Sequence, residues 1–216
     1  MLKREDIELS NLTRTAAEYL QKQLKLTQDE TEVILYGLQV LTYSLAGIFT
    51  ICLMGWLLGC FWTTIAVALT AATLRLVSGG AHSRSPLLCN ILGMIVAPFL
   101  AKLAVYAAPQ ISTVVLIIIV LLGALFSLLT FYSLAPVDSP AKPITSEQER
   151  RKFKHVSVAL TSLITLGQVV LLISGNLSTL VLAVSLGTWW QAFTLTRAGH
   201  RFASIVDNLF LRRCKV

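Results

Sequence analysis

A histidine and a cysteine, His82 and Cys89, are the residues of this sequence best suited to covalent chemistry. A cysteine thiolate is a strong nucleophile and a nearby imidazole can accept the thiol proton, so the pair is suited to nucleophilic acyl transfer. On one uninterrupted helix, the seven-residue spacing would put both side chains on the same face but about 10 Å apart along the axis. Because a proton cannot pass directly over that distance, the pair requires a chain that bends between them.

The residues around the pair can make such a bend. Gly79 and Gly80 allow backbone angles that other residues avoid, and Pro86 favours an extended conformation at Ser85. Ser85 is a good N-cap, and Pro86 suits the first position of a helix. Cys89 would then lie in the first turn, where unpaired N–H groups and the helix dipole favour a thiolate and could hold a developing oxyanion.

A purely structural interpretation competes with the catalytic one. Cysteine is a common packing residue in apolar helices, and a single histidine near a helix end is usually an interfacial polar group. The pair alone favours neither interpretation. Charged side chains between residues 33 and 136 are limited to Arg75, Arg84 and Lys102. Two of these three flank His82, and polar groups at membrane depth are costly, so the segment predicts a functional site. Lys102 is expected to extend to the interface instead.

The composition is that of a membrane protein. Of 216 residues, 55% are hydrophobic and 13% are charged, and the mean hydropathy is +0.73. The net charge of +7 does not require nucleic acid as a partner, because basic residues are expected in the cytoplasmic loops of a membrane protein. Residues 1–8 are mixed in charge and do not resemble a cleaved signal peptide. The cysteines have irregular spacings that match no zinc or disulfide framework, and we expect no metal or other cofactor: Cys52, Cys60, Cys89 and Cys214.

Six apolar segments are long enough to cross a bilayer as helices. They predict an all-α polytopic bundle of six transmembrane helices over residues 33–196, with the bent segment around His82 before the third span. Thr27 and Glu30 have the form of a capping box and predict a helix start. Pro98 is expected to bend the third span. The predicted spans are residues 33–54, 60–76, 87–107, 111–134, 155–174 and 177–196.

The two terminal segments and the loops predict how the chain is oriented in the membrane. Residues 1–32 and 197–216 carry apolar side chains at helical spacing among charged ones, and they are predicted to form amphipathic helices on the cytoplasmic membrane surface. Lysine and arginine together number five in each of these segments and five in the loop 135–154, whereas the predicted outer turns have none. The positive-inside rule therefore places both termini, this loop and the loop 77–86 in the cytoplasm.

The sequence resembles the accessory gene regulator B (AgrB) family of bacterial membrane peptidases. The resemblance rests on Arg75, on the Gly-Gly-Ala-His motif that ends at His82, on Cys89 seven residues later, and on a block within residues 135–154 that is similar to the family's large inner loop. It implies a cysteine endopeptidase of the bacterial cell membrane that cuts an autoinducing-peptide precursor, an AgrD-like pro-peptide, for quorum sensing. It also suggests a homodimer, which nothing in the residues shows.

The resemblance implies roles for the two central residues. His82 would accept the thiol proton, and Cys89 would attack the carbonyl at the end of the signal segment and release the C-terminal part of the precursor as the leaving group. A cysteine or serine of the signal would then attack the resulting thioester and close a thiolactone or lactone ring. Exchange of one thioester for another changes the bond energy little, so ring closure needs no ATP if water is excluded from the site.

Other residues would support the site. Arg75 would bind a substrate carboxylate or orient the loop, although it could also simply mark the inner boundary of the second span. Gly79 and Gly80 are explained as backbone requirements, and Ser85 as a cap. Ala81 stands where many family members carry a larger, often aromatic residue, which bears on the shape of the substrate pocket.

Several polar residues have weaker claims. The third group that orients His82 could be Asp138, Ser85 or Ser83, the last of which stands where the family often has alanine. His155 is a rival base, although an interfacial role explains it as well. The basic residues that could attract an acidic precursor tail are also the ones that the positive-inside rule alone would place there: Arg84, Arg150, Arg151 and Lys152.

Two other functions remain open at the level of sequence. A membrane transporter, or an exporter of the finished peptide, could use a broken helix for substrate binding, but the break lies at the inner edge and the spans contain no acidic residue to couple a cation. A membrane thiol acyltransferase with a lipid substrate could use the same cysteine. An acyl adduct would form on Cys89 in an endopeptidase or in an acyltransferase but not in a transporter, so its detection separates the two enzymes from the transporter.

Overall fold

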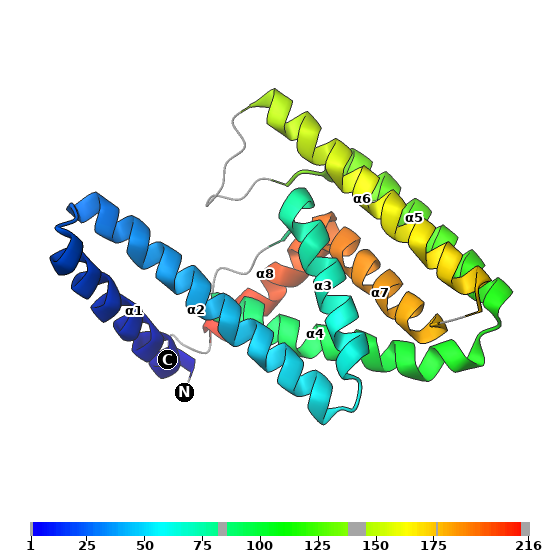
Figure 1. Ribbon diagram of the computed structural model, residues 1–216, viewed down its shortest axis with the longest axis horizontal. Helices are drawn as coiled ribbons and strands as arrows, with labels where there is room; N and C mark the ends of the chain where they lie inside the picture. The colour runs from blue at the N-terminus through cyan, green and yellow to red at the C-terminus, as the bar shows by residue number, and fades with distance from the viewer. Residues whose placement is uncertain (1, 82–85, 138–145, 176, 213–216) are drawn as a thin grey trace.

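The fold consists of helices, as the sequence predicts. The computed structural model describes residues 2–81, 86–137, 146–175 and 177–212, and these ranges contain no β-strand. The all-α class is therefore confirmed for the described part of the chain (Figure 1). The elements in chain order are α1 (Leu2–Leu24), α2 (Gln28–Leu57), α3 (Phe61–Ser78), α4 (Pro86–Ala107), the 3-10 helix η1 (Ala108–Gln110), α5 (Thr113–Leu134), α6 (Glu147–Ile173), α7 (Ser178–Leu195) and α8 (Arg197–Arg212).

Five helices in the described ranges are long and apolar enough to cross a membrane: α2, α3, α4 continued by η1, α5 and α6. The segment predicted as the sixth span forms α7, whose serine, threonine, glutamine and tryptophan side chains lower its mean hydropathy. Helix α7 packs against α3, α4, α5, α6 and α8. Four of its polar side chains are buried among these neighbours: Ser185, Thr188, Gln191 and Thr194. A count of six spans stays a prediction.

Local signals in the sequence set several helix ends. Thr27 caps α2 through a complete capping box, in which its backbone N–H donates to the Glu30 carboxylate at 2.9 Å. Helix α2 ends at Leu57, inside the predicted break. Lys102 does more than extend to the interface, because its Nζ donates to the carbonyl oxygen of Leu58 at 2.9 Å. It thereby satisfies a carbonyl that the end of α2 leaves unpaired.

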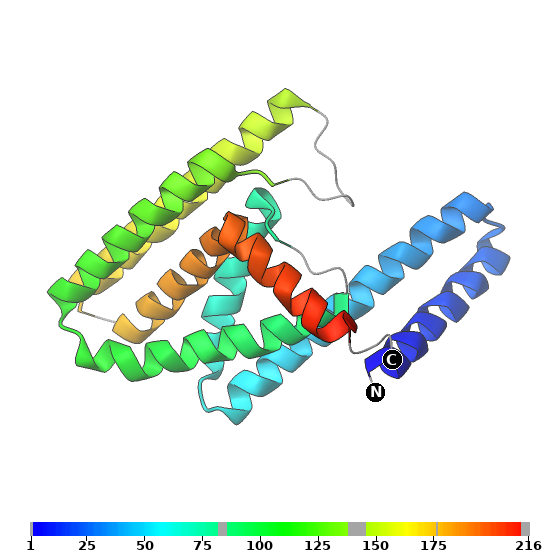
Figure 2. The same cartoon turned by 180° about the vertical axis from the view of Figure 1, so that it is seen from behind.

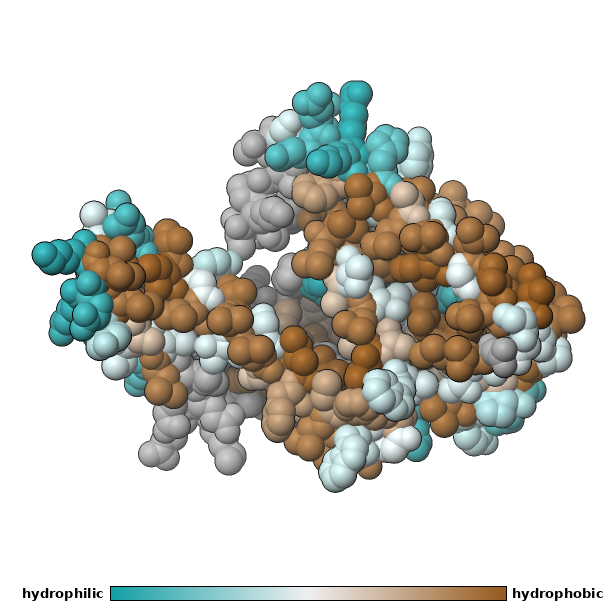
Figure 3. Space-filling view, in the orientation of Figure 1, coloured by the Kyte–Doolittle hydropathy of each residue, from teal (hydrophilic) through white to brown (hydrophobic). Residues whose placement is uncertain are grey.

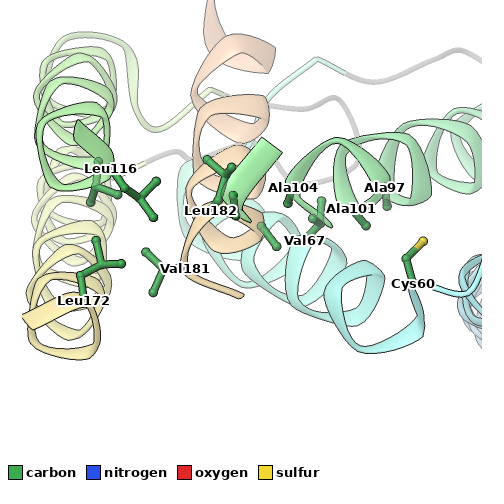
Figure 4. Packing of buried hydrophobic residues seen from close by; sticks show 12 residues of the cluster. Cys60, Val67, Ala97, Ala101, Ala104, Leu116, Leu172, Val181 and Leu182 are labelled. Atoms are coloured by element: carbon green, nitrogen blue, oxygen red, sulfur yellow. The ribbon is translucent and has the colours of Figure 1, made fainter. Parts of the chain in front are cut away.

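Small and branched side chains form the centre of the bundle (Figure 4). Val67, Ala101, Ala104 and Val181 are each at most 1% exposed. A Cβ atom added at Gly187 would lie 2.7 Å from the carbonyl oxygen of Val67, so α3 and α7 approach each other closely. This close packing holds the end of α3 against α7 and thereby sets the position of the residues that follow α3.

The N-terminal helices form a hairpin in which α1 packs against α2 (Figure 1). Helix α2 packs against α4 at Gly47, where an added Cβ would lie 2.7 Å from Oδ1 of Asn90. On the visible face in Figure 3, hydrophobic atoms cover most of the bundle, and hydrophilic atoms gather where α6 begins and at the turn between α1 and α2. This distribution fits a bundle that lies in lipid with polar ends.

Candidate functional site

The chain turns sharply after α3. Helix α3 ends at Ser78, and Gly79 and Gly80 have positive φ angles of 68° and 139°. A Cβ atom at Gly79 would overlap the carbonyl oxygen of Val137, and one at Gly80 would lie 2.7 Å from Oγ1 of Thr194. Both positions therefore require glycine, for the backbone conformation and for lack of space.

Four hydrogen bonds fasten this turn to distant parts of the chain. Nε2 of Gln191 donates to the carbonyl oxygen of Gly79 at 2.7 Å and to Oγ of Ser78 at 3.0 Å. The backbone N–H of Ala81 donates to the carbonyl oxygen of Thr194 at 2.9 Å, and that of Val137 donates to the carbonyl oxygen of Ser78 at 2.9 Å. The turn is thus bound to α7 on one side and to the segment after α5 on the other.

The guanidinium of Arg75 completes the anchoring of the turn. It donates to the carbonyl oxygen of Ala81, so both backbone polar groups of Ala81 are paired. Arg75 projects from the last turn of α3 and is largely withdrawn from solvent. The path of the chain is therefore fixed up to the residue that precedes His82.

Cys89 lies in the first turn of α4, as predicted, because α4 begins at Pro86. Its thiol is free and half-buried. The next residue, Asn90, donates from Nδ2 to the carbonyl oxygen of Tyr43 at 2.8 Å and ties the first turn of α4 to α2. Cys89 therefore lies at the start of a helix that packs against α2 and also against α3 and α7.

A cavity of about 110 Å³ joins the turn to Cys89. Helix α3 and the turn contribute Arg75 and Ala81, so a positively charged guanidinium lines the same cavity as the Cys89 thiol. Figure 2 shows α8 running from the end of α7 toward the start of α4, and both helices contribute to the lining. The remaining lining residues are Leu92 and Gly93 of α4, Trp190, Phe193 and Thr194 of α7, and Gly199, Phe202 and Ala203 of α8.

The sequence-predicted site residues have different outcomes. Arg75, Gly79, Gly80 and Cys89 lie together at the turn and its cavity. The other predicted members of the turn, and all three candidates for the third catalytic group, lie outside the described residues: His82, Ser83, Arg84, Ser85 and Asp138.

The basic residues of the predicted inner loop lie elsewhere. Arg150, Arg151 and Lys152 are exposed in the first turns of α6 and do not line the cavity of Cys89. Arg151 forms an exposed ion pair with Glu147 at 3.7 Å. His155 is also exposed on α6 and does not line the cavity. Within the described ranges, no group of three histidine, cysteine, aspartate or glutamate side chains could hold a metal ion.

Sequence reasoning missed the residues that α7 and α8 contribute. Gln191 is only 1% exposed and holds the turn, and Trp190, Phe193 and Phe202 form an aromatic wall. Ring centroids lie 6.0 Å apart for Trp190 and Phe202 and 6.2 Å apart for Phe193 and Phe202. A glutamine inside an apolar helix was the one available signal, because such a side chain needs a partner when it is buried.

Most of the chain is similar to proteins of one family. The family model for accessory gene regulator B matches residues 13–195. An AgrB-like protein of Clostridium perfringens strain SM101 is 28% identical over 209 residues, which cover 93% of this chain and 97% of the relative. AgrB-like protein 2 of C. perfringens strain 13 has the same identity and coverage, and AgrB-like protein 1 of that strain is 29% identical over 153 residues, 71% of this chain and 79% of the relative. No solved structure matches the chain.

Proposed function

Because this chain belongs to the AgrB family, we propose that it is an integral-membrane cysteine endopeptidase with Cys89 as its nucleophile and His82 as its base. The family is involved in processing peptides for accessory gene regulator quorum sensing, and it acts with AgrD-like peptides at the membrane. The proposed substrate is an AgrD-like pro-peptide. The observation that carries the proposal is the thiol of Cys89 at a helix N-terminus, in one cavity with the charge of Arg75.

The first step of the proposed reaction forms an acyl-enzyme. His82 accepts the proton of the Cys89 thiol, and the sulfur forms a bond to a backbone carbonyl carbon of the pro-peptide. The carbon–nitrogen bond of that peptide unit then breaks, and the leaving amine takes the proton from His82. The N-terminal part of the pro-peptide remains on Cys89 as a thioester. The N–H groups in the first turn of a helix have no partner within the helix, so those after Pro86 in α4 are suited to hold the negative oxygen of the tetrahedral intermediate.

The second step releases the product as a ring. A cysteine or serine of the bound peptide transfers its proton to His82 and attacks the thioester carbonyl, and the bond to the Cys89 sulfur breaks. The proton returns from His82 to Cys89, so the enzyme is restored. The aromatic wall formed by Trp190, Phe193 and Phe202 supports this step, because an apolar lining limits access of water to the thioester.

His82 lies outside the described residues, so its role rests on the sequence and on the residue before it. Ala81 lines the cavity of Cys89, and both of its backbone polar groups are hydrogen-bonded. We also propose that α7 is a sixth span, with both termini and the site on the cytoplasmic side, because this arrangement satisfies the positive-inside rule.

Reconstitution of the full chain in liposomes tests the proposal. The protein is incubated with a panel of AgrD-like pro-peptides, and mass spectrometry follows the cut product and the acyl adduct on Cys89. Wild-type protein should yield both. Cys89→Ala and His82→Ala should each reduce cleavage at least about 10³-fold. Cys52→Ala and His155→Ala are matched controls, since neither residue lines the cavity, and they should cleave like wild type.

Three outcomes would contradict the assignment. Unchanged cleavage in Cys89→Ala or His82→Ala, with the fold intact, would rule out the assigned roles. An adduct of a lipid acyl chain on Cys89, in place of the peptide, would indicate a membrane acyltransferase. Peptide flux into the liposomes that survives Cys89→Ser, without a cut product, would indicate a transporter.

A further inference from the structure

One wall of the cavity has no part in the proposed bond-making steps. It consists of Trp190 and Phe193 of α7, Phe202 and Ala203 of α8, and Leu92 of α4. We propose that this wall forms a subsite for the apolar side chain of the substrate residue whose carbonyl Cys89 attacks. The inference rests on the proposed function. It assigns selection of the cleavage position to an apolar side chain on the residue before the cleaved bond.

The location of the wall determines which substrate residue it meets. Cys89 lines the same cavity as the aromatic residues. During acyl transfer, the residue whose carbonyl carbon bonds to the sulfur is the part of the peptide nearest the nucleophile. It also stays bound through both steps, whereas the leaving segment departs after the first. We therefore expect a pocket that includes the nucleophile to bind the side chain of the residue whose carbonyl carbon is attacked.

The size and lining of the cavity indicate the chemical class of that residue. A cavity of about 110 Å³ is somewhat smaller than the roughly 150 Å³ apolar cavity that admits benzene. It suits a side chain of the size of leucine. Among the described lining residues, polar groups come from Cys89, Thr194, the indole of Trp190 and Arg75, and Arg75 already donates to the carbonyl oxygen of Ala81. The rest of the lining is apolar, which favours an apolar side chain over a charged one.

The subsite exists because α8 is docked against α7. Gly199, in the first turn of α8, packs so closely that an added Cβ would overlap the carbonyl oxygen of Phe193. This approach brings Phe202 into edge-to-face contact with Trp190, with ring centroids 6.0 Å apart. The C-terminal helix, expected from the sequence to lie on the membrane surface, thus supplies part of the wall beside the nucleophile.

Alkylation of Cys89 by small probes tests the subsite without a pro-peptide. The probes are acetyl-amino acid chloromethyl ketones with glycine, leucine, tryptophan or aspartate next to the reactive group, and a palmitoyl-glycine chloromethyl ketone. Rates of adduct formation on Cys89 of the full chain in lipid nanodiscs are followed by mass spectrometry. Each rate is divided by the rate with iodoacetamide, which carries no side chain and reports general reactivity of the thiol.

Wild-type protein should react with the leucine probe at least about tenfold faster than with the glycine probe, since even one methylene group changes selectivity in an apolar pocket by about 10- to 200-fold. Ala203→Leu should fill the pocket and bring the leucine-to-glycine ratio close to one. Ala198→Leu introduces the same side chain at an exposed position of α8 outside the lining, and it should keep the wild-type ratio.

A second variant keeps the test independent of the folding of Ala203→Leu. Phe202→Ala enlarges the pocket and should raise the rate of the tryptophan probe relative to the leucine probe. Equal rates for leucine and glycine in wild type would overturn the inference. So would a preference for the aspartate probe, which would assign the subsite to Arg75, or for the palmitoyl probe, which would indicate a lipid chain as occupant.

The two proposals fail in different experiments. If the probes discriminate as expected but no AgrD-like pro-peptide is cut, the subsite stands and the proposed function fails. If pro-peptides are cut at Cys89 but the probes and the Ala203→Leu variant show no discrimination, the function stands and the subsite inference fails.

Discussion

Gln191 donates a hydrogen bond of 2.7 Å to the carbonyl oxygen of Gly79, a residue 112 positions earlier in the chain. The same nitrogen lies 3.0 Å from Oγ of Ser78, and the glutamine side chain is buried. One amide near the C-terminal end of α7 thus helps to hold the backbone turn that leads to His82, together with Arg75 and two backbone hydrogen bonds. This contact makes α7 part of the site, although α7 supplies no group for the bond-making steps.

Replacement of Gln191 should impair the site more than it impairs the fold. Gln191→Leu leaves the carbonyl oxygen of Gly79 without its donor, at a cost of about 1–3 kcal/mol in unfolding free energy. We expect cleavage of a pro-peptide to fall about tenfold or more. Gln168→Leu is the matched control, because Gln168 is also buried and bonds Ser185 at 2.8 Å, away from the cavity.

Thermal unfolding in detergent, followed by tryptophan fluorescence, should show similar losses of stability for the two glutamine variants. Only Gln191→Leu should lower kcat for cleavage. Equal loss of activity in both variants would mean that Gln191 acts through general stability alone.

Arg75 should matter for the reactivity of Cys89. Arg75→Met removes a positive charge from the cavity of Cys89 and a donor to the carbonyl of Ala81. We expect alkylation of Cys89 by iodoacetamide to slow by about three- to tenfold, because the cavity then holds no positive charge to favour a thiolate nucleophile. Lys102→Met removes a cation that donates to the carbonyl of Leu58, and it should leave the rate unchanged.

The measurement is the rate of carbamidomethylation of Cys89 at fixed pH. Arg75→Lys separates the two roles of Arg75, since it keeps the charge but not the planar fork of donors. An unchanged rate in Arg75→Met would show that its charge does not act on the nucleophile.

Gly79→Ala should destabilise the protein more than Gly59→Ala. Both glycines have φ angles near the left-handed region, 68° for Gly79 and 65° for Gly59. A side chain with a positive φ angle costs about 1–2 kcal/mol in the left-handed region, and Gly79, with a ψ angle of −148°, lies close to a region that is essentially restricted to glycine. Only at Gly79 would the added Cβ also overlap a backbone oxygen, that of Val137, whereas nothing lies within 4 Å at Gly59. Midpoints of thermal unfolding in detergent should therefore fall further for Gly79→Ala, and equal shifts would contradict the tight packing of the turn.

Docking of α8 should depend on Gly199. Gly199→Ala would overlap the carbonyl oxygen of Phe193, so α8 has to move away from α7. Limited proteolysis should then cut α8 faster, and Cys89 should lose its preference for the leucine probe. Gly167→Ala is the control on α6, where nothing lies within 4 Å of the added atom. If α8 stays protected from protease in Gly199→Ala, its close contact with α7 is not required for docking.

Features set by neighbouring residues could be predicted from the sequence. The capping box of Thr27 fixed the start of α2, and Pro86 fixed the start of α4 and with it the place of Cys89 in the first turn. The need for glycine at positions 79 and 80 also follows from local chain geometry. These signals work because a cap or a turn depends on only a few adjacent residues.

Features set by distant contacts could not be predicted in this way. Gln191 looks like one more polar residue in an apolar segment until its acceptor on Gly79 is known. The amphipathic pattern of residues 197–216 fits a membrane surface as well as it fits a helix docked on α7. The position of Phe202 beside the cavity depends on how closely Gly199 approaches Phe193, and no local pattern encodes that distance.

The hydrogen bond from Asn90 to Tyr43 connects the hairpin of α1 and α2 to α4, the helix that carries the nucleophile. Asn90 directly follows Cys89 and donates a hydrogen bond to the backbone of α2, and α1 packs against that same helix. A shift of the hairpin would therefore tilt the helix that bears the thiol. Reporter tags, fusion partners or crosslinks added near the N-terminus are expected to alter chemistry at the thiol, even though they are attached far from it in the sequence.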